Sequence, residues 1–211
     1  MDARSCTTPG RPICPASDPA SSRRHSAGAR LLRLAKSRGA YVTTARAGNR
    51  ILGNPGAGYC VRILHPTRTP WKSLGRNDDS LVLSVETASG RAILTGDLEE
   101  EGIARLLARL LARPEPLTCD LLMLPHHGAE AANLGRLLDA GSPTVVVASA
   151  RTGGLSPRTR SAVEERGLPL VLTSAGGRVR AVLGPQGVSV STFLEPRERS
   201  PAPAARFAPD G

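Results

Sequence analysis

Side chains that commonly bind metal ions occur at two places in the chain, each directly after an apolar segment. Asp97 follows a segment that ends in Gly96, whereas His126 and His127 follow the segment LLMLP and precede Gly128. A carboxylate together with imidazoles suits a borderline divalent cation such as zinc or manganese. The two glycines allow the backbone to turn tightly beside an ion. These residue types at these positions therefore favour a zinc or manganese site.

Simpler interpretations exist for each part of this pattern. Asp97 alone is also compatible with the N-cap position of a following helix, because Asp is a preferred N-cap residue. A single histidine in a loop is commonly a polar surface residue. An adjacent histidine pair that closes an apolar strand is less common, and its occurrence together with Asp97 at two strand ends favours the metal site.

The elements that must position these residues alternate between strand and helix patterns. Apolar residues at a helical period predict a helix over 98–113, and alternating residues predict a hairpin of strands at 80–86 and 91–96. Further strands are expected at 41–44, 60–65, 119–125, 144–149, 168–172, 178–183 and 188–193, helices at 27–38, 130–140 and 156–167, and a polar loop at 66–79. This order predicts an α/β domain with a mixed sheet flanked by helices. In such sheets ligands converge at the carboxyl ends of strands.

Composition excludes several classes of protein. The 211 residues contain no run of 18 apolar residues, which argues against a transmembrane helix, and the first residues lack the apolar region of a secretory signal. We therefore expect a cytoplasmic protein without a membrane segment. Aromatic residues make up 2% of the chain, which argues against a stacking platform for single strands.

The net charge of +10 has two explanations. All basic residues except Lys36 and Lys72 are arginine, a bias that a GC-rich genome produces without selection on the protein. Alternatively, the charge attracts a polyanion such as nucleic acid. No run of five like charges forms a separate basic arm.

The cysteines do not indicate a zinc knuckle or a disulfide framework. No pair of the 4 cysteines has CxxC spacing. Cys60 and Cys119 stand in apolar segments, so both are expected to be buried free thiols.

Three segments in the middle of the chain resemble a known family. The segments are Asn77-Asp78-Asp79-Ser80 before an apolar strand, Leu94-Thr95-Gly96-Asp97, and Leu124-Pro125-His126-His127-Gly128. In this order they resemble the C-terminal part of the metallo-β-lactamase-fold domain of ComEC-type competence proteins, which internalise DNA. The resemblance implies a partial αββα domain over 27–194. Residues 1–26 and 195–211 are expected to be disordered because they lack apolar periodicity.

The resemblance also implies a chemistry and a set of site residues. In such domains two metal ions activate a water molecule that attacks a phosphodiester or another ester. Asp97 would be a metal ligand, and His126 (which we favour) or His127 would supply a further ligand. Asn77 and Ser80 would shape the rim of the site, supported by Gly96 and Gly128. DNA or another phosphodiester is the implied partner.

The chain departs from the family pattern at several positions. The upstream His-x-His/Asp-x-Asp-His cluster is missing, since the remaining histidines are only His25 and His65. The stretch 150–157, which matches the segment where the family carries a His-Pro pair, contains no histidine, and Ala129 replaces a serine. One carboxylate and two imidazoles are a small donor set for two metals.

These departures leave two explanations and two functions open. The chain is a truncated form of the domain, a degenerate form, or both. It is either a metal-dependent hydrolase of the phosphodiesterase or nuclease type, or an inactive remnant that acts as an interaction or nucleic-acid-binding module. A partner chain or a second copy would cover the missing half of the domain.

Overall fold

The computed structural model of the chain describes residues 30–42, 45–53, 58–66, 77–112, 117–151 and 153–194. The chain divides into two compact units, Met1–Thr44 and Ala45–Gly211. The described part of the first unit contains a helix over 30–37, where a helix was predicted over 27–38. Residues 41–42, the described part of the strand predicted over 41–44, belong to no strand. The segments 1–26 and 195–211, for which disorder is predicted, lie outside the described residues.

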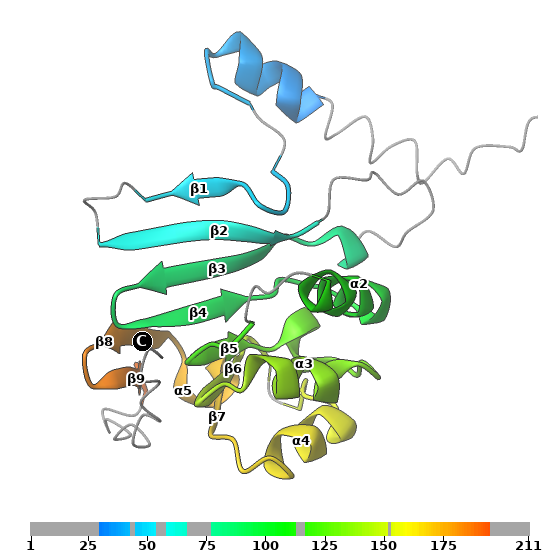
Figure 1. The fold of residues 1–211 in the computed structure, drawn as a ribbon, viewed down its shortest axis with the longest axis vertical. Coiled ribbons are helices and arrows are strands. Elements are labelled where there is room, and N and C mark those ends of the chain that lie inside the picture. The colour runs from blue at the N-terminus through cyan, green and yellow to red at the C-terminus, as the bar shows by residue number, and fades with distance from the viewer. Residues whose placement is uncertain are drawn as a thin grey trace, which may run out of the picture. The chain divides into compact units, whose positions relative to one another are not determined.

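The second unit is built on a seven-stranded mixed sheet whose strands lie in the order of the sequence (Figure 1). The strands are β1 (Arg50–Leu52), β2 (Tyr59–His65), β3 (Val82–Thr87), β4 (Gly90–Leu94), β5 (Leu121–Met123), β6 (Val145–Ala148) and β7 (Leu170–Leu172). The first four pair antiparallel, and β4 to β7 pair parallel. The change begins after the β3–β4 hairpin, whose tight turn joins antiparallel strands, because parallel neighbours such as β4 and β5 need a crossover segment, here α2.

Three helices pack on one face of this sheet (Figure 1). They are α2 (Glu100–Leu111), α3 (Leu134–Gly141) and α4 (Pro157–Glu164). Their apolar stripes meet the inward residues of alternate strand positions. The fully buried members of this core include Ile103, Leu106, Leu137, Leu138 and Val163 of the helices and Val82, Ile93, Leu122 and Val146 of the strands. The predicted α/β fold with a mixed sheet flanked by helices is confirmed.

A C-terminal hairpin packs on the opposite face of the sheet. It consists of β8 (Val179–Gly184) and β9 (Gly187–Thr192), which follow the short helix α5 (Thr173–Gly176). Val188 of the hairpin joins Leu121 and Val145 in a second, smaller apolar cluster. The sheet is therefore a middle layer between helices and a hairpin.

Several predicted boundaries are wrong, each for a local reason. The strand predicted at 119–125 ends at Met123, because the short 3-10 helix η2 (Pro125–Gly128) begins at the proline. The loop predicted at 66–79 contains the 3-10 helix η1 (Asn77–Asp79), and its residues 67–76 lie outside the described part. The strand β1 was not predicted from the sequence.

The two cysteines of the second unit differ in burial. Cys119 is buried, and burial raises the pKa of its thiol to about 12. Cys60 is only half-buried, so the expectation of a buried thiol is wrong there. Among the described helices, none combines the length and the apolar character needed to cross a membrane.

Candidate functional site

The residues predicted for a metal site come together at the carboxyl ends of two neighbouring strands. β4 and β5 are parallel neighbours, so the segments after Leu94 and Met123 emerge at the same edge. Two hydrogen bonds hold these segments together. The Thr95 hydroxyl donates to the Met123 carbonyl oxygen (2.7 Å), and the His126 backbone N–H donates to the Gly96 carbonyl oxygen (3.0 Å).

Two carboxylate–imidazole pairs lie at this edge. The Asp97 Oδ1 atom is 3.4 Å from His127 Nε2, and the Glu99 Oε1 atom is 3.2 Å from His126 Nδ1. All four side chains are accessible to solvent, at 36% to 57% of their surface. Within the part of the chain that the structure describes, no three His, Cys, Asp or Glu side chains are grouped so that they could hold a metal ion.

The orientation of His127 is fixed by its second ring nitrogen. His127 Nδ1 lies 2.7 Å from the backbone carbonyl oxygen of Ser149, which can only accept, so Nδ1 carries a proton. In the neutral ring, Nε2 then presents a lone pair to the Asp97 carboxylate. Two acceptors face each other at 3.4 Å, and a proton or a metal ion between them removes the conflict. A histidine that donates its other N–H to a carbonyl group is the usual arrangement of a metal ligand.

The turn that carries both histidines is conformationally strained. His126, His127 and Gly128 have φ angles of 44°, 58° and 81°, so three consecutive residues are left-handed. Such a conformation costs a non-glycine residue roughly 1–2 kcal/mol. Contacts after the turn hold it, since the Ser156 N–H donates to the Gly128 carbonyl oxygen (3.0 Å). Strain that surrounding contacts maintain is a common feature of functional sites.

Asn77 and Ser80, predicted for the rim, lie beside the pairs. The Asn77 side-chain amide donates to Glu99 Oε1 (2.9 Å), the same oxygen that faces His126. A Cβ atom placed on Gly96 would lie 3.5 Å from Ser80 Cβ, so these two residues are in contact. Their functional role stays a prediction.

The alternative interpretation of Asp97 as a helix N-cap is wrong. The helix α2 begins at Glu100, and Glu99 occupies its N-cap position without a side-chain cap. The Glu99 side chain instead pairs with His126, a contact that was not predicted. The sequence holds only a positional signal for it, because Glu99 lies two residues after Asp97 in the connection between β4 and α2.

His65 is buried and does not belong to the two carboxylate–imidazole pairs. Its ring is 1% exposed, and its Nε2 atom lies 2.8 Å from the Asp78 carbonyl oxygen. The Asp78 carboxylate in turn accepts a hydrogen bond from the Gly102 N–H (2.7 Å). Burial lowers the pKa of His65, so the ring stays neutral. The residue links β2 to the first turn of α2.

Comparison with known proteins gives one relevant similarity. No protein-family model matches the chain. The chain is 31% identical over 121 residues to "Competence protein ComA" of Neisseria gonorrhoeae. The alignment covers 56% of this chain and 17% of that protein, so the chain spans less than a fifth of the length of this relative. The similarity supports a relationship between this chain and ComEC-type competence proteins.

Proposed function

We propose that the chain is a metallo-β-lactamase-type domain that acts on DNA in competence, as a metal-dependent hydrolase of phosphodiester bonds. The observation that carries this proposal is the pair of carboxylate–imidazole contacts at adjacent strand ends. The His127 ring supports it further, because its N–H is bound to a carbonyl group and its lone pair faces Asp97. The similarity to a competence protein supports the biological setting.

The donor set fits part of a metal site rather than a complete one. Asp97 and His127 are two donors of suitable type for zinc or manganese, and Glu99 with His126 are two more. A catalytic zinc ion normally has three protein ligands and an open position, at which it activates a water molecule. The described residues fall short of three grouped ligands. Hydrolysis by this domain therefore needs at least one further ligand.

Metal binding tests the proposal directly. Protein stripped with a chelator is titrated with Zn²⁺, and separately with Mn²⁺, in a calorimeter. We expect saturable binding that weakens more than about tenfold in Asp97→Ala and in His127→Ala, because each variant removes one donor. The matched control is Glu164→Ala, which removes an exposed carboxylate of α4 that is 3.9 Å from Arg160. Absence of saturable binding by the unaltered protein, or equal loss in the control, would contradict the proposal.

A further ligand from a second chain gives a separate test. We propose that a partner chain or a second copy of this chain supplies this further ligand. In the case of a second copy, zinc should raise the mass measured by light scattering, and Asp97→Ala should remove this response. A monomer at saturating zinc would exclude the second copy.

The shortage of donors favours a second candidate function, a non-catalytic nucleic-acid-binding or interaction module. The net charge of +10 is compatible with this function. Such a module would bind DNA with steep salt dependence, would leave it uncut, and would bind equally well with a chelator present. Cleavage of DNA that requires Zn²⁺ or Mn²⁺ and Asp97 would exclude it.

A further inference from the structure

The positive charge of the chain is concentrated in one interval of the sequence. No Asp or Glu occurs between Asp18 and Asp78, and the Lys and Arg residues of this interval more than account for the net charge of +10 of the whole chain. A genome-wide base bias affects all parts of a chain alike, so it does not explain this uneven distribution. Because the interval includes β1 and β2, it places positive charge at one edge of the seven-stranded sheet.

Three arginines lie at this edge, and we call Arg46, Arg50 and Arg62 the edge arginines. Arg50 of β1 and Arg62 of β2 are direct partners in the antiparallel register, so their side chains lie on the same face of the sheet. The segment that carries Arg46 continues along β2, since the Gly48 N–H donates to the Ile63 carbonyl oxygen (2.8 Å). Arg46 and Arg50 are exposed, and the Arg62 side chain is 47% exposed.

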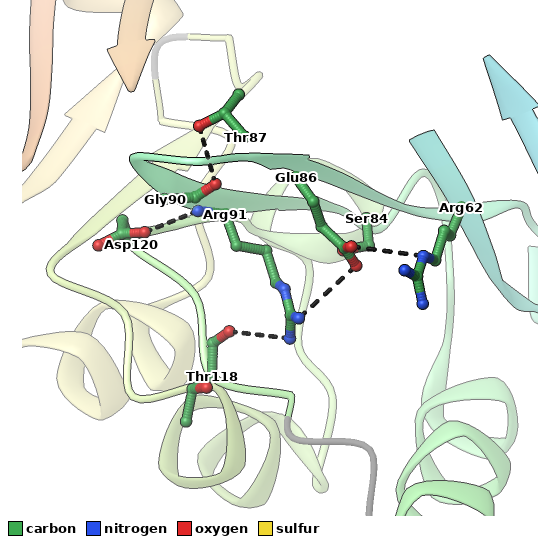
Figure 2. Close-up of polar contacts among 8 residues, drawn as sticks. All are labelled: Arg62, Ser84, Glu86, Thr87, Gly90, Arg91, Thr118 and Asp120. Carbon is green, nitrogen blue, oxygen red and sulfur yellow. Dashed lines mark hydrogen bonds and ion pairs between the residues drawn. The ribbon is translucent and has the colours of Figure 1, made fainter. Parts of the chain in front are cut away.

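The carboxylates around the edge arginines do not balance their charge. Glu86 Oε2 is 3.3 Å from Arg62 Nε (Figure 2). The same carboxylate is 3.6 Å from Arg91 Nη2, so its charge is divided between two guanidinium groups. Arg46 and Arg50 form no ion pair with any residue that the structure describes. The edge therefore keeps an excess of positive charge.

The direct pairing of Arg50 with Arg62 is unfavourable in the free protein. Like charges directly opposite each other on antiparallel strands destabilise a sheet. An anion bound between two guanidinium groups removes this repulsion, and their planar N–H groups match the oxygens of a phosphate. The pair therefore favours a ligand that carries phosphate.

The edge arginines suit a phosphate backbone rather than unpaired bases. Proteins that bind single strands stack the bases on aromatic rings. Tyr59 is three residues from Arg62 along β2, so its ring lies on the opposite face of the sheet. Double-stranded DNA carries one negative charge per about 1.7 Å of its axis, and basic side chains bind these charges without contacting the bases. A DNA duplex is therefore the ligand that matches this edge.

We propose that the edge arginines bind the phosphate backbone of double-stranded DNA. This inference rests on the proposed function for its choice of DNA as the polyanion. The edge is separate from the candidate metal site, because β1 lies three strands away from β4, roughly 14 Å at the usual spacing of strands. Binding at the edge therefore requires no metal ion.

The salt dependence of DNA binding tests the proposal. The full chain is titrated into a labelled duplex of about 20 base pairs at about 50 to 200 mM salt, with a chelator present, and fluorescence anisotropy reports binding. Arg46→Ala and Arg50→Ala should each reduce the slope of log K against log salt by about 0.9, since each removes one phosphate contact. At the lowest salt concentration the affinity should fall about tenfold. Arg50→Lys keeps the charge and should keep the slope.

Two controls separate binding from folding. Arg160→Ala removes an equal charge from α4, where Arg160 is 3.9 Å from Glu164, and should leave the slope unchanged. Arg50→Ala should raise the melting temperature of the free protein, because it removes the repulsion between Arg50 and Arg62. Loss of a residue that only supports the sheet would lower the melting temperature instead.

Several results would overturn the proposal. They are failure of the unaltered protein to bind the duplex, an unchanged slope in both Arg46→Ala and Arg50→Ala, and an equal change of slope in Arg160→Ala. Binding to phosphatidylserine vesicles without binding to the duplex would overturn it as well. Because the chelator removes metal from every titration, a negative result in the metal-binding experiment leaves this test unaffected, and the two proposals can fail separately.

Discussion

Replacement of Gly128 by alanine tests whether the histidine turn is held in a left-handed conformation by close packing. Gly128 is buried and has a φ of +81°. A Cβ atom there would lie 2.2 Å from the Leu155 Cδ1 atom, which is far closer than packing allows. The left-handed conformation costs alanine roughly 1–2 kcal/mol, and forcing a methyl group into a packed core costs roughly 1–3 kcal/mol more. Gly128→Ala should therefore lower the free energy of unfolding by roughly 2–5 kcal/mol.

Gly153 provides a matched control for the conformational part of this cost. Its φ is +71°, close to that of Gly128, but no atom lies within 4 Å of a Cβ placed there. Gly153→Ala should therefore cost only the roughly 1–2 kcal/mol of the left-handed conformation. Urea unfolding followed by circular dichroism measures both variants, and the difference between them isolates the contact with Leu155.

A double-mutant cycle completes the test. Leu155→Ala removes the atoms that a methyl group at Gly128 would meet, so the loss from Gly128→Ala should be smaller in that background. Leu155→Ala by itself should destabilise the domain. The Leu155 side chain is only 8% exposed, so its truncation leaves a cavity in the core. Equal losses for Gly128→Ala and Gly153→Ala, together with additive effects in the cycle, would refute the reasoning.

Three further predictions concern single residues. Because burial lowers the pKa of His65 below 6.5, the unfolded chain takes up a proton that the folded state does not, so stability should fall as pH drops below that value. His65→Gln should reduce this slope in urea titrations across that range. Since the Cys119 pKa is about 12, only about one thiol in 10,000 is ionised near pH 8, so iodoacetamide should modify Cys60 first and Cys119 only after unfolding, as peptide mass spectrometry would show. Ser156→Ala should cost about 1 kcal/mol in urea unfolding, because the serine side chain caps α4 by accepting from the Thr159 N–H at 3.0 Å.

Elements with a strong local signal could be predicted from the sequence. The apolar stripe of α2 placed that helix to within two residues at each end, and Ser156 with Pro157 marked the start of α4 correctly. Both signals act within a few residues and do not depend on the rest of the fold. The strand β1 has three residues, and its extended conformation depends on pairing with β2 across a loop, so periodicity alone gave no indication of it.

The candidate site could be predicted in its position but not in its pairing. Asp97 and the two histidines meet because β4 and β5 are parallel neighbours, which the alternation of strands and helices implied. Which imidazole faces which carboxylate depends on the left-handed turn at His126 and His127. Distant groups such as the Ser149 carbonyl oxygen hold that turn, and no local sequence pattern encodes them.

The connection β4–α2–β5 carries both carboxylate–imidazole pairs within one continuous stretch of chain, from Gly90 to Gly128. All four side chains therefore lie on a single crossover between two neighbouring strands, and the contacts from Ser149 and Ser156 hold the histidine turn from outside it. Substitutions in β1, β2 or the C-terminal hairpin can change stability while leaving this spacing intact. Loss of this one stretch would remove both pairs together, whereas changes near Ser149 or Ser156 would alter only the histidine turn.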